Sequence, residues 1–302
     1  MAGSGDSKTA ILYALGANFS IFIAKSVAAF ITGSSAMLAE AVHSLADCGN
    51  QGLLLLGMKR AKRPPSPDYP LGYGKAIYFW AFLVALILFS VGGVFSIYEG
   101  IHKLQAPEEL RQPWWAIGVL VFAIAAEGVS MGKCMIEVNK ARGSQSLWRW
   151  FRESRQAELV VIFGEDLAAL LGLVFALVAV GAAMITGNAT YDAIGTLAIG
   201  ALLIVVAVFV AIEVKAMLIG QGVEPRVKAR MLEFLEGRPE LRRVFNLLTL
   251  QLGDDVMVAI KAEMDRDQST LGVVESINAV EAELRVQFPQ VRWCFFEPDV
   301  AD

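Results

Sequence analysis

The sequence predicts an α-helical membrane protein, with six transmembrane helices followed by a small α+β domain. The first observation is composition: of 302 residues, 56% are hydrophobic and 19% are charged, and the mean hydropathy is +0.53. A soluble domain of this length needs fewer apolar residues for its core. The apolar residues also form long runs up to about residue 220. Amphipathic and alternating patterns replace these runs afterwards.

The predicted transmembrane helices follow from the rule that a spanning helix needs about 20 mostly apolar residues. We expect them at about 9–31, 36–58, 76–104, 113–136, 158–186 and 191–219. The first run follows a segment without the features of a cleaved signal peptide, so we expect it to stay as a helix. The links after the second and fourth helices are rich in Lys and Arg, and the other links carry almost none. The positive-inside rule therefore predicts that both termini are cytoplasmic.

The region after residue 220 has the pattern of a separate domain. "VEPRVKARMLEFLEGRP" and "STLGVVESINAVEAELRVQF" predict amphipathic helices. "NLLTLQLGDDVMVAIKAEMD" predicts two strands joined at Gly-Asp-Asp, and "VRWCFFEP" predicts a last strand. The order αββαβ predicts two helices on one face of a three-stranded sheet. We therefore expect a transmembrane domain at 1–220 and a cytoplasmic dimerisation domain at 221–302.

Several classes of function are not expected. The net charge is −4, and no Lys/Arg stripe is interleaved with aromatic residues, so a nucleic-acid partner is not predicted. Cys48, Cys134 and Cys294 have no CxxC spacing, which argues against a disulfide framework or a thiolate zinc knuckle. The sequence also lacks HExxH and nucleophile-elbow motifs, so we do not expect an enzyme.

Four polar residues of the second helix form one stripe. Glu40, His43, Asp47 and Asn50 are 3, 4 and 3 residues apart. Because His43 and Asp47 lie one turn apart, they can converge on one cation, as half of a tetrahedral site for zinc or a similar metal. The alternative is hydrogen bonding to neighbouring helices. Ionisable groups inside a membrane are costly and usually functional, which favours the metal site.

The fifth helix is expected to supply the only other comparable group. "VVIFGEDLAALLGL" carries Glu165 beside Asp166, and the face of Asp166 is otherwise apolar. We expect Asp166 to complete the site. Glu165 could be a second ligand, a proton carrier or the partner of a basic residue. Asn18 of the first helix could offer a carbonyl oxygen or hydrogen-bond between helices.

The remaining polar groups of these helices have simpler expectations. Lys25 is expected to reach the outer interface or to pair with Glu40. Cys48 points off the polar stripe, and His102 is expected at the surface. Small residues are expected to allow close helix packing: Gly92, Gly93, Gly172, Gly195 and Gly200.

The charges of the proposed ligands predict a mechanism. A divalent ion held by His43, Asp47 and Asp166 meets two carboxylates and one neutral ring, so the loaded site is close to neutral. When the ion leaves, the two carboxylates repel each other in a partly dry cavity. Protons should therefore enter as the metal leaves, which predicts metal transport coupled to proton counter-transport.

Three segments resemble the cation diffusion facilitator family over nearly the whole chain: "SSAMLAEAVHSLADCGNQGLLLLG", "KRPPSPDYPLGYGKAIYFW" and "GEDLAALLG". This resemblance implies a homodimer that exports Zn²⁺ or another divalent transition metal from the cytosol, usually in exchange for protons. It also implies a ferredoxin-like C-terminal domain. We expect an integral protein of a bacterial inner membrane.

The family's ligand pair on the second helix falls on His43 and Asp47, and its fifth-helix aspartate falls on Asp166. Its other fifth-helix ligand falls on Ile162, which cannot bind metal. Glu165, Asn18, a water or a backbone carbonyl must then fill the gap. The family's accessory sites look absent, since the loop after the second helix offers few ligands and the C-terminal domain has no histidine.

Metal identity is only partly constrained by these residues. His43 favours zinc, cobalt, nickel or iron over magnesium and calcium. Oxygen donors such as Glu165 leave manganese and ferrous iron open, and zinc is the best single expectation. A membrane scaffold or regulator that kept the fold and lost its fourth ligand is the competing hypothesis.

Overall fold

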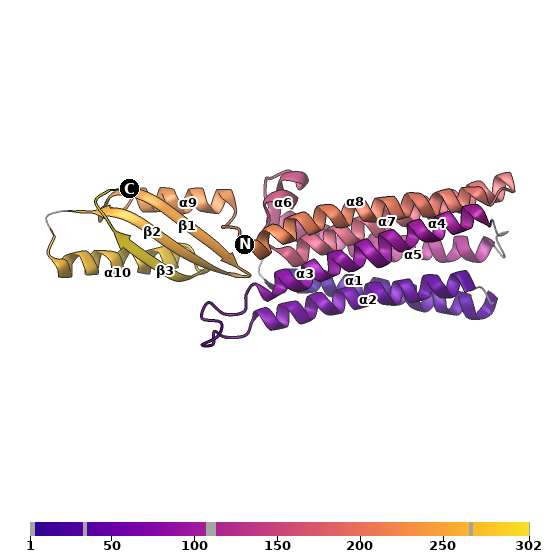
Figure 1. Ribbon diagram of the computed structural model, residues 1–302, viewed down its shortest axis with the longest axis horizontal. Coiled ribbons are helices and arrows are strands. Elements are labelled where there is room, and N and C mark those ends of the chain that lie inside the picture. The colour runs from indigo at the N-terminus through magenta and orange to yellow at the C-terminus, as the bar shows by residue number, and fades with distance from the viewer. Residues whose placement is uncertain (1–3, 33–34, 107–112, 266–267, 302) are drawn as a thin grey trace.

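The computed structural model describes residues 4–32, 35–106, 113–265 and 268–301. A long helical bundle is joined at one end to a small sheet covered by helices (Figure 1). The helical segments of the bundle are α1 Ser4–Thr32, α2 Ser35–Ala61, α3 Ala76–Ile87, η1 Leu88–Val94, α4 Phe95–Gln105, α5 Pro113–Arg142, α6 Leu147–Glu153, α7 Ala157–Thr186 and α8 Thr190–Ile219.

The predicted helices agree with this bundle, with two differences. The third predicted helix consists of α3, the π-helical η1 and α4, because the backbone widens around Gly92 and Gly93. The short α6 lies in the basic link before α7 and was not predicted. The Ser146 hydroxyl accepts a hydrogen bond from the Arg149 amide and caps the N-terminus of α6.

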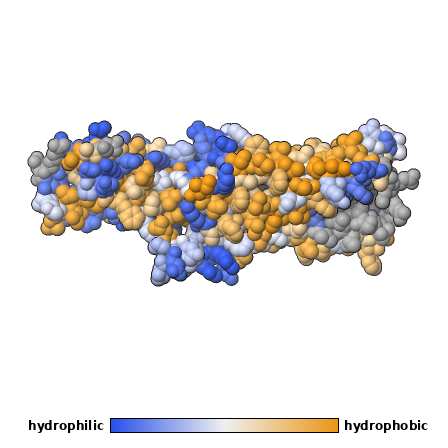
Figure 2. Space-filling view, viewed as in Figure 1, coloured by the Kyte–Doolittle hydropathy of each residue, from blue (hydrophilic) through white to orange (hydrophobic). Residues whose placement is uncertain are grey.

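Five described helical segments are long and apolar enough to cross a membrane: Ser7–Ile31, Ala76–Gln105, Trp114–Arg142, Ala157–Thr186 and Thr190–Ile219. Hydrophobic surface covers much of the bundle, and hydrophilic residues gather where the bundle meets the C-terminal elements (Figure 2). The protein is therefore a multi-pass membrane protein. The sixth predicted span, α2, packs along α1 but is not among the five. Its polar stripe, which includes His43 and Asp47, lowers its hydropathy.

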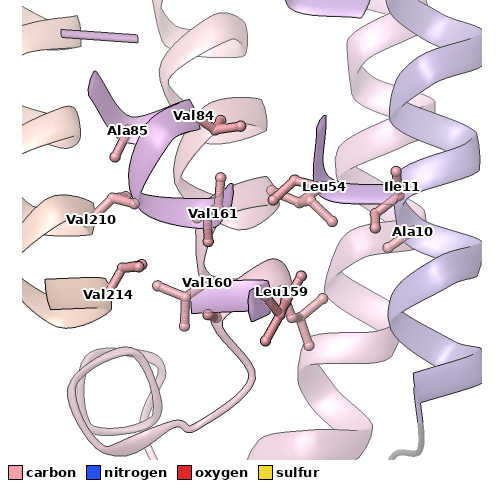
Figure 3. Packing of buried hydrophobic residues seen from close by; sticks show 14 of the residues in the cluster. Ala10, Ile11, Leu54, Val84, Ala85, Leu159, Val160, Val161, Val210 and Val214 are labelled. Carbon is pink, nitrogen blue, oxygen red and sulfur yellow. The ribbon is translucent and has the colours of Figure 1, made fainter. Parts of the chain in front are cut away.

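An apolar cluster fills the half of the bundle nearest the C-terminal elements. Side chains from α1, α2, α3, α7 and α8 meet there (Figure 3). They include Ile11, Leu54, Val84, Leu159, Val161 and Val210. Ile162 belongs to the same cluster and is fully buried. We call this set the apolar cluster.

Close helix packing at glycines is confirmed in the other half of the bundle. A Cβ at Gly200 would lie 2.8 Å from the Ile97 backbone nitrogen, and one at Gly195 would lie 2.3 Å from the Ala179 Cβ. The absence of side chains at these glycines therefore lets α8 approach α4 and α7 closely.

The C-terminal elements have the predicted order αββαβ: α9 Pro225–Glu236, β1 Leu241–Leu252, β2 Asp255–Met264, α10 Thr270–Gln287 and β3 Val291–Pro298. We call them the C-terminal domain. The sheet order is β1-β2-β3, with β1 antiparallel and β3 parallel to β2. Alternate residues of β2, such as Val258 and Ile260, are buried against α9 and α10 residues such as Leu235 and Leu284. These contacts form a separate hydrophobic core.

The β1–β2 turn is also where the C-terminal domain meets the bundle. Gly253 takes a positive φ of 69° in this turn, and its N–H donates a hydrogen bond to the Tyr78 hydroxyl of α3 at 3.0 Å. A Cβ at Gly74 would lie 1.9 Å from the Leu252 carbonyl oxygen. Only glycine therefore allows this backbone contact without a shift.

Candidate metal site

All five predicted site residues line one cavity of about 280 Å³ in the bundle: Asn18, His43, Asp47, Glu165 and Asp166. The structure therefore brings side chains of α1, α2 and α7 to one cavity. Residues of α4, α5 and α8 complete the wall.

The predicted pair on α2 lies one helical turn apart and is partly exposed. The His43 Nε2 atom is 3.9 Å from Asp47 Oδ2. This spacing follows from the i, i+4 arrangement on one helix face. The side chain of Glu40, the outermost residue of the predicted stripe, lies outside the described residues.

The two neighbouring carboxylates of α7 point to different helices. Ser130 of α5 donates a hydrogen bond to Asp166 Oδ2 at 2.9 Å, and Asn50 of α2 donates one to Glu165 Oε1 at 3.1 Å. Adjacent helix residues diverge by about 100°, which explains the two directions. Asp166 and Glu165 are only 1% and 4% exposed. The hydrogen-bond partner of Glu165 is thus the side-chain amide of Asn50 on α2. The Glu165 Oε2 atom has no hydrogen-bond partner among the described residues.

Asn18 lies in the wall of the cavity, and Ile162 lies outside it, in the apolar cluster. Asn18 is buried and lines the cavity from α1. Ile162 precedes Asp166 by one turn and packs into the apolar cluster, so its side chain adds no donor.

The predicted residues share a cavity but do not converge on one point. Within the described parts of the chain, no group of three or more His, Cys, Asp or Glu could hold a metal ion. The residues would therefore have to move closer to bind an ion together.

The expectation that α7 supplies the only group comparable to His43 and Asp47 is wrong. Glu127 of α5 is 2% exposed and lines the same cavity. The sequence signal was present, since "FAIAAEGVSMGKC" places this glutamate in an apolar run.

Of the two alternatives for Lys25, reaching the outer interface is wrong, because Lys25 is 7% exposed and lines the cavity. The other, pairing with Glu40, stays a prediction, since the Glu40 side chain lies outside the described residues. His102 is exposed, as expected.

The family to which this chain belongs is shown by its match to a known protein family. Residues 11–219 match the cation efflux transmembrane domain. The chain belongs to the cation efflux, or cation diffusion facilitator, family. The match covers more than half of the chain and includes every predicted site residue. The resemblance inferred from the sequence is therefore confirmed.

Sequence similarity to individual proteins supports this family assignment. The mouse and human proteins named "Proton-coupled zinc antiporter SLC30A9, mitochondrial" are both 34% identical to this chain over 248 residues, which is 80% of this chain and 43% of each relative. Metal tolerance protein C4 of Arabidopsis thaliana is 29% identical over 265 residues, which is 86% of this chain and 57% of that protein. This chain thus spans less than half the length of the two animal relatives.

Proposed function

We propose that this chain exports a divalent transition metal from the cytosol, Zn²⁺ first among them, in exchange for protons. The observation that carries the proposal is the cavity inside the bundle that His43, Asp47, Asp166 and Glu165 line together. Ionisable groups inside a membrane are energetically costly and usually functional. Membership of the cation efflux family and the names of the animal relatives favour zinc and proton coupling.

The roles of these side chains follow from their charges. Asp47 and Asp166 balance the charge of the cation, and His43 adds a neutral nitrogen donor that favours transition metals. Asn18 offers an amide oxygen. Glu165, held by Asn50, serves as a further ligand or carries a proton. Protons replace the charge of the metal when the metal leaves.

Alternating access agrees with where the cavity extends. Besides the site residues, it is lined by Glu99, Lys103 and Asp192, which lie at the end of the bundle far from the C-terminal domain. Lys103 Nζ is 3.0 Å from Asp192 Oδ2 there. The apolar cluster fills the opposite half. This arrangement supports a conformation open towards the far end, and export requires a second one open towards the C-terminal domain.

The arrangement in the membrane is part of the proposal. We propose that α2 is the sixth span, that both termini are cytosolic, and that residues 1–220 form the transport domain. Residues 221–302 would form a ferredoxin-like domain that holds a homodimer together. The location in a bacterial inner membrane stays a prediction from the sequence, and the names of the animal relatives place those proteins in mitochondria.

The test is zinc-driven proton movement in proteoliposomes that hold the full chain. We expect Asp47→Asn to reduce exchange at least about tenfold, since changing even the outer partners of metal ligands costs about 10- to 100-fold. Asp68→Asn is the matched control, because Asp68 lies exposed in the loop between α2 and α3. Undiminished exchange in Asp47→Asn would overturn the assignment.

Two alternatives have specific support and separate tests. A non-transporting scaffold is favoured by Ile162 and by the lack of convergent ligands in the described residues. A scaffold would bind no metal in its transmembrane domain, so the metal stoichiometry of the purified chain separates it from an exporter. An exporter selective for Mn²⁺, Fe²⁺ or Co²⁺ would transport one of these ions in preference to Zn²⁺ when they compete.

A further inference from the structure

We propose that Glu127 of α5 is a metal ligand of this cavity and supplies the donor that Ile162 cannot supply from α7. The inference rests on the proposed function and extends its ligand set to a further helix. It is carried by the register of α5 against α7, by the burial of Glu127 and by the charges around it.

The register of α5 places Glu127 about one helical turn from the level of Asp166. Ser130 is fixed against α7 by its hydrogen bond to Asp166. Glu127 precedes Ser130 by three residues and lies on the same buried helix face. The helical rise puts it about 4.5 Å further from the C-terminal domain. Glu127 thus lies about one turn beyond the level of Asp166 along the cavity.

The register of α2 brings Asp47 to the same level. Asn50 is fixed against α7 by its hydrogen bond to Glu165. Asp47 precedes Asn50 by three residues, so it also lies about 4.5 Å further from the C-terminal domain. Asp47 and Glu127 therefore approach one level of the cavity from two helices, and Asp166 lines the same cavity from α7.

Ile162 stands where the family resemblance implies the second metal ligand of the fifth helix. It lies one turn from Asp166 towards the C-terminal domain, inside the apolar cluster. Glu127 lies on the other side of Asp166, where the cavity is. We infer that the fourth donor has moved from the apolar side of Asp166 to the cavity side.

The state of the Glu127 carboxylate points to a cation as its partner. Glu127 is 2% exposed, and its Oε2 atom has no hydrogen-bond partner among the described residues. The charged groups that act on it are Asp166, Asp47 and Lys25. Two of these three are carboxylates. Buried carboxylates gathered around one cavity repel one another until a metal cation or a proton neutralises the charge.

A purely structural role for Glu127 is the competing explanation. Lys25 lines the same cavity and could be neutralised by Glu127. The two roles differ in what can replace the carboxylate. A neutral imidazole can bind a transition metal but cannot balance a lysine.

The experiment measures Zn²⁺ binding to the full chain in nanodiscs by equilibrium dialysis and calorimetry. We expect Glu127→Gln to weaken binding at least about tenfold and Glu127→His to restore most of it. The matched control is Glu137→Gln. Glu137 lies on the same helix and is 7% exposed, but it pairs with Lys140 at 2.9 Å and does not line the cavity.

The outcomes separate this inference from the proposed function. If Asp47→Asn loses Zn²⁺ binding and Glu127→Gln binds like the original chain, the inference is wrong and the proposed function stands. If Asp47→Asn also binds unchanged, both fail. Equal loss in Glu127→Gln and Glu127→His identifies a structural role and overturns the inference.

A second measurement keeps the test decisive if Glu127→Gln does not fold. A nitrogen donor at this position should raise the preference for Zn²⁺ over Mn²⁺. We therefore expect Glu127→His to raise the ratio of Zn²⁺ to Mn²⁺ affinity at least severalfold. An unchanged ratio shows that position 127 does not touch the ion.

Discussion

Replacing Gly74 by alanine should loosen the contact between the bundle and the C-terminal domain. The added Cβ would lie 1.9 Å from the Leu252 carbonyl oxygen and 2.6 Å from the Leu252 carbonyl carbon. Close carbon–oxygen contacts are about 3.3 Å or longer. The β1–β2 turn must therefore retreat by about 1.4 Å, which carries Gly253 out of reach of the Tyr78 hydroxyl.

The magnitude follows from the two interactions that change. Inserting a methyl group into a tight contact costs about 1–3 kcal/mol, and the lost Gly253–Tyr78 hydrogen bond contributes about 0.5–1.5 kcal/mol. Together they weaken docking by about 1.5–4.5 kcal/mol. Since every 1.4 kcal/mol is about tenfold in an equilibrium constant, the Gly253 amide should lose at least about tenfold of its protection from hydrogen exchange.

The assay is hydrogen–deuterium exchange of the β1–β2 turn in the full chain. Tyr78→Phe removes only the hydrogen bond and should increase Gly253 exchange about two- to tenfold. Gly118→Ala is the control, because a Cβ there meets nothing within 4 Å. If Gly74→Ala exchanges no faster than Gly118→Ala, the contact does not hold the two parts together and the reasoning is refuted.

Two further predictions concern the hydrogen bond from Ser130 to Asp166 and the ion pair between Arg238 and Glu240. Ser130→Ala removes the donor to buried Asp166 and should destabilise the protein by about 1–3 kcal/mol in chemical unfolding; a change below about 0.5 kcal/mol would contradict this. Burial alone raises the pKa of Glu240, but its two hydrogen bonds and ion pair with Arg238 lower the pKa below the usual value overall. The pair therefore stabilises the folded chain above the unfolded pKa of about 4.3. Its contribution is lost as pH falls through the lower folded pKa. Glu240→Gln should reduce stability at pH 7 and flatten its acid dependence, and an unchanged pH profile of unfolding would refute this.

The elements were predictable because their signals are local. Run length and apolar content locate five spans, and residue periodicity gives the order αββαβ. The spacing of His43 and Asp47 gives their shared helix face without any tertiary information. The short α6 was missed, since its seven residues are too few for a clear period.

The sequence by itself determined the family, the kind of protein and five of the polar residues that line the cavity. Only the tertiary structure decided that Ser130 holds Asp166, that Asn50 holds Glu165, and that Glu127 joins them. The physical reason is that a helix fixes which of its own residues share a face. Its rotation and shift against other helices depend on packing at distant contacts, such as those of the glycines of α8. For the same reason, the sequence could not show that Gly74 packs against the β1–β2 turn.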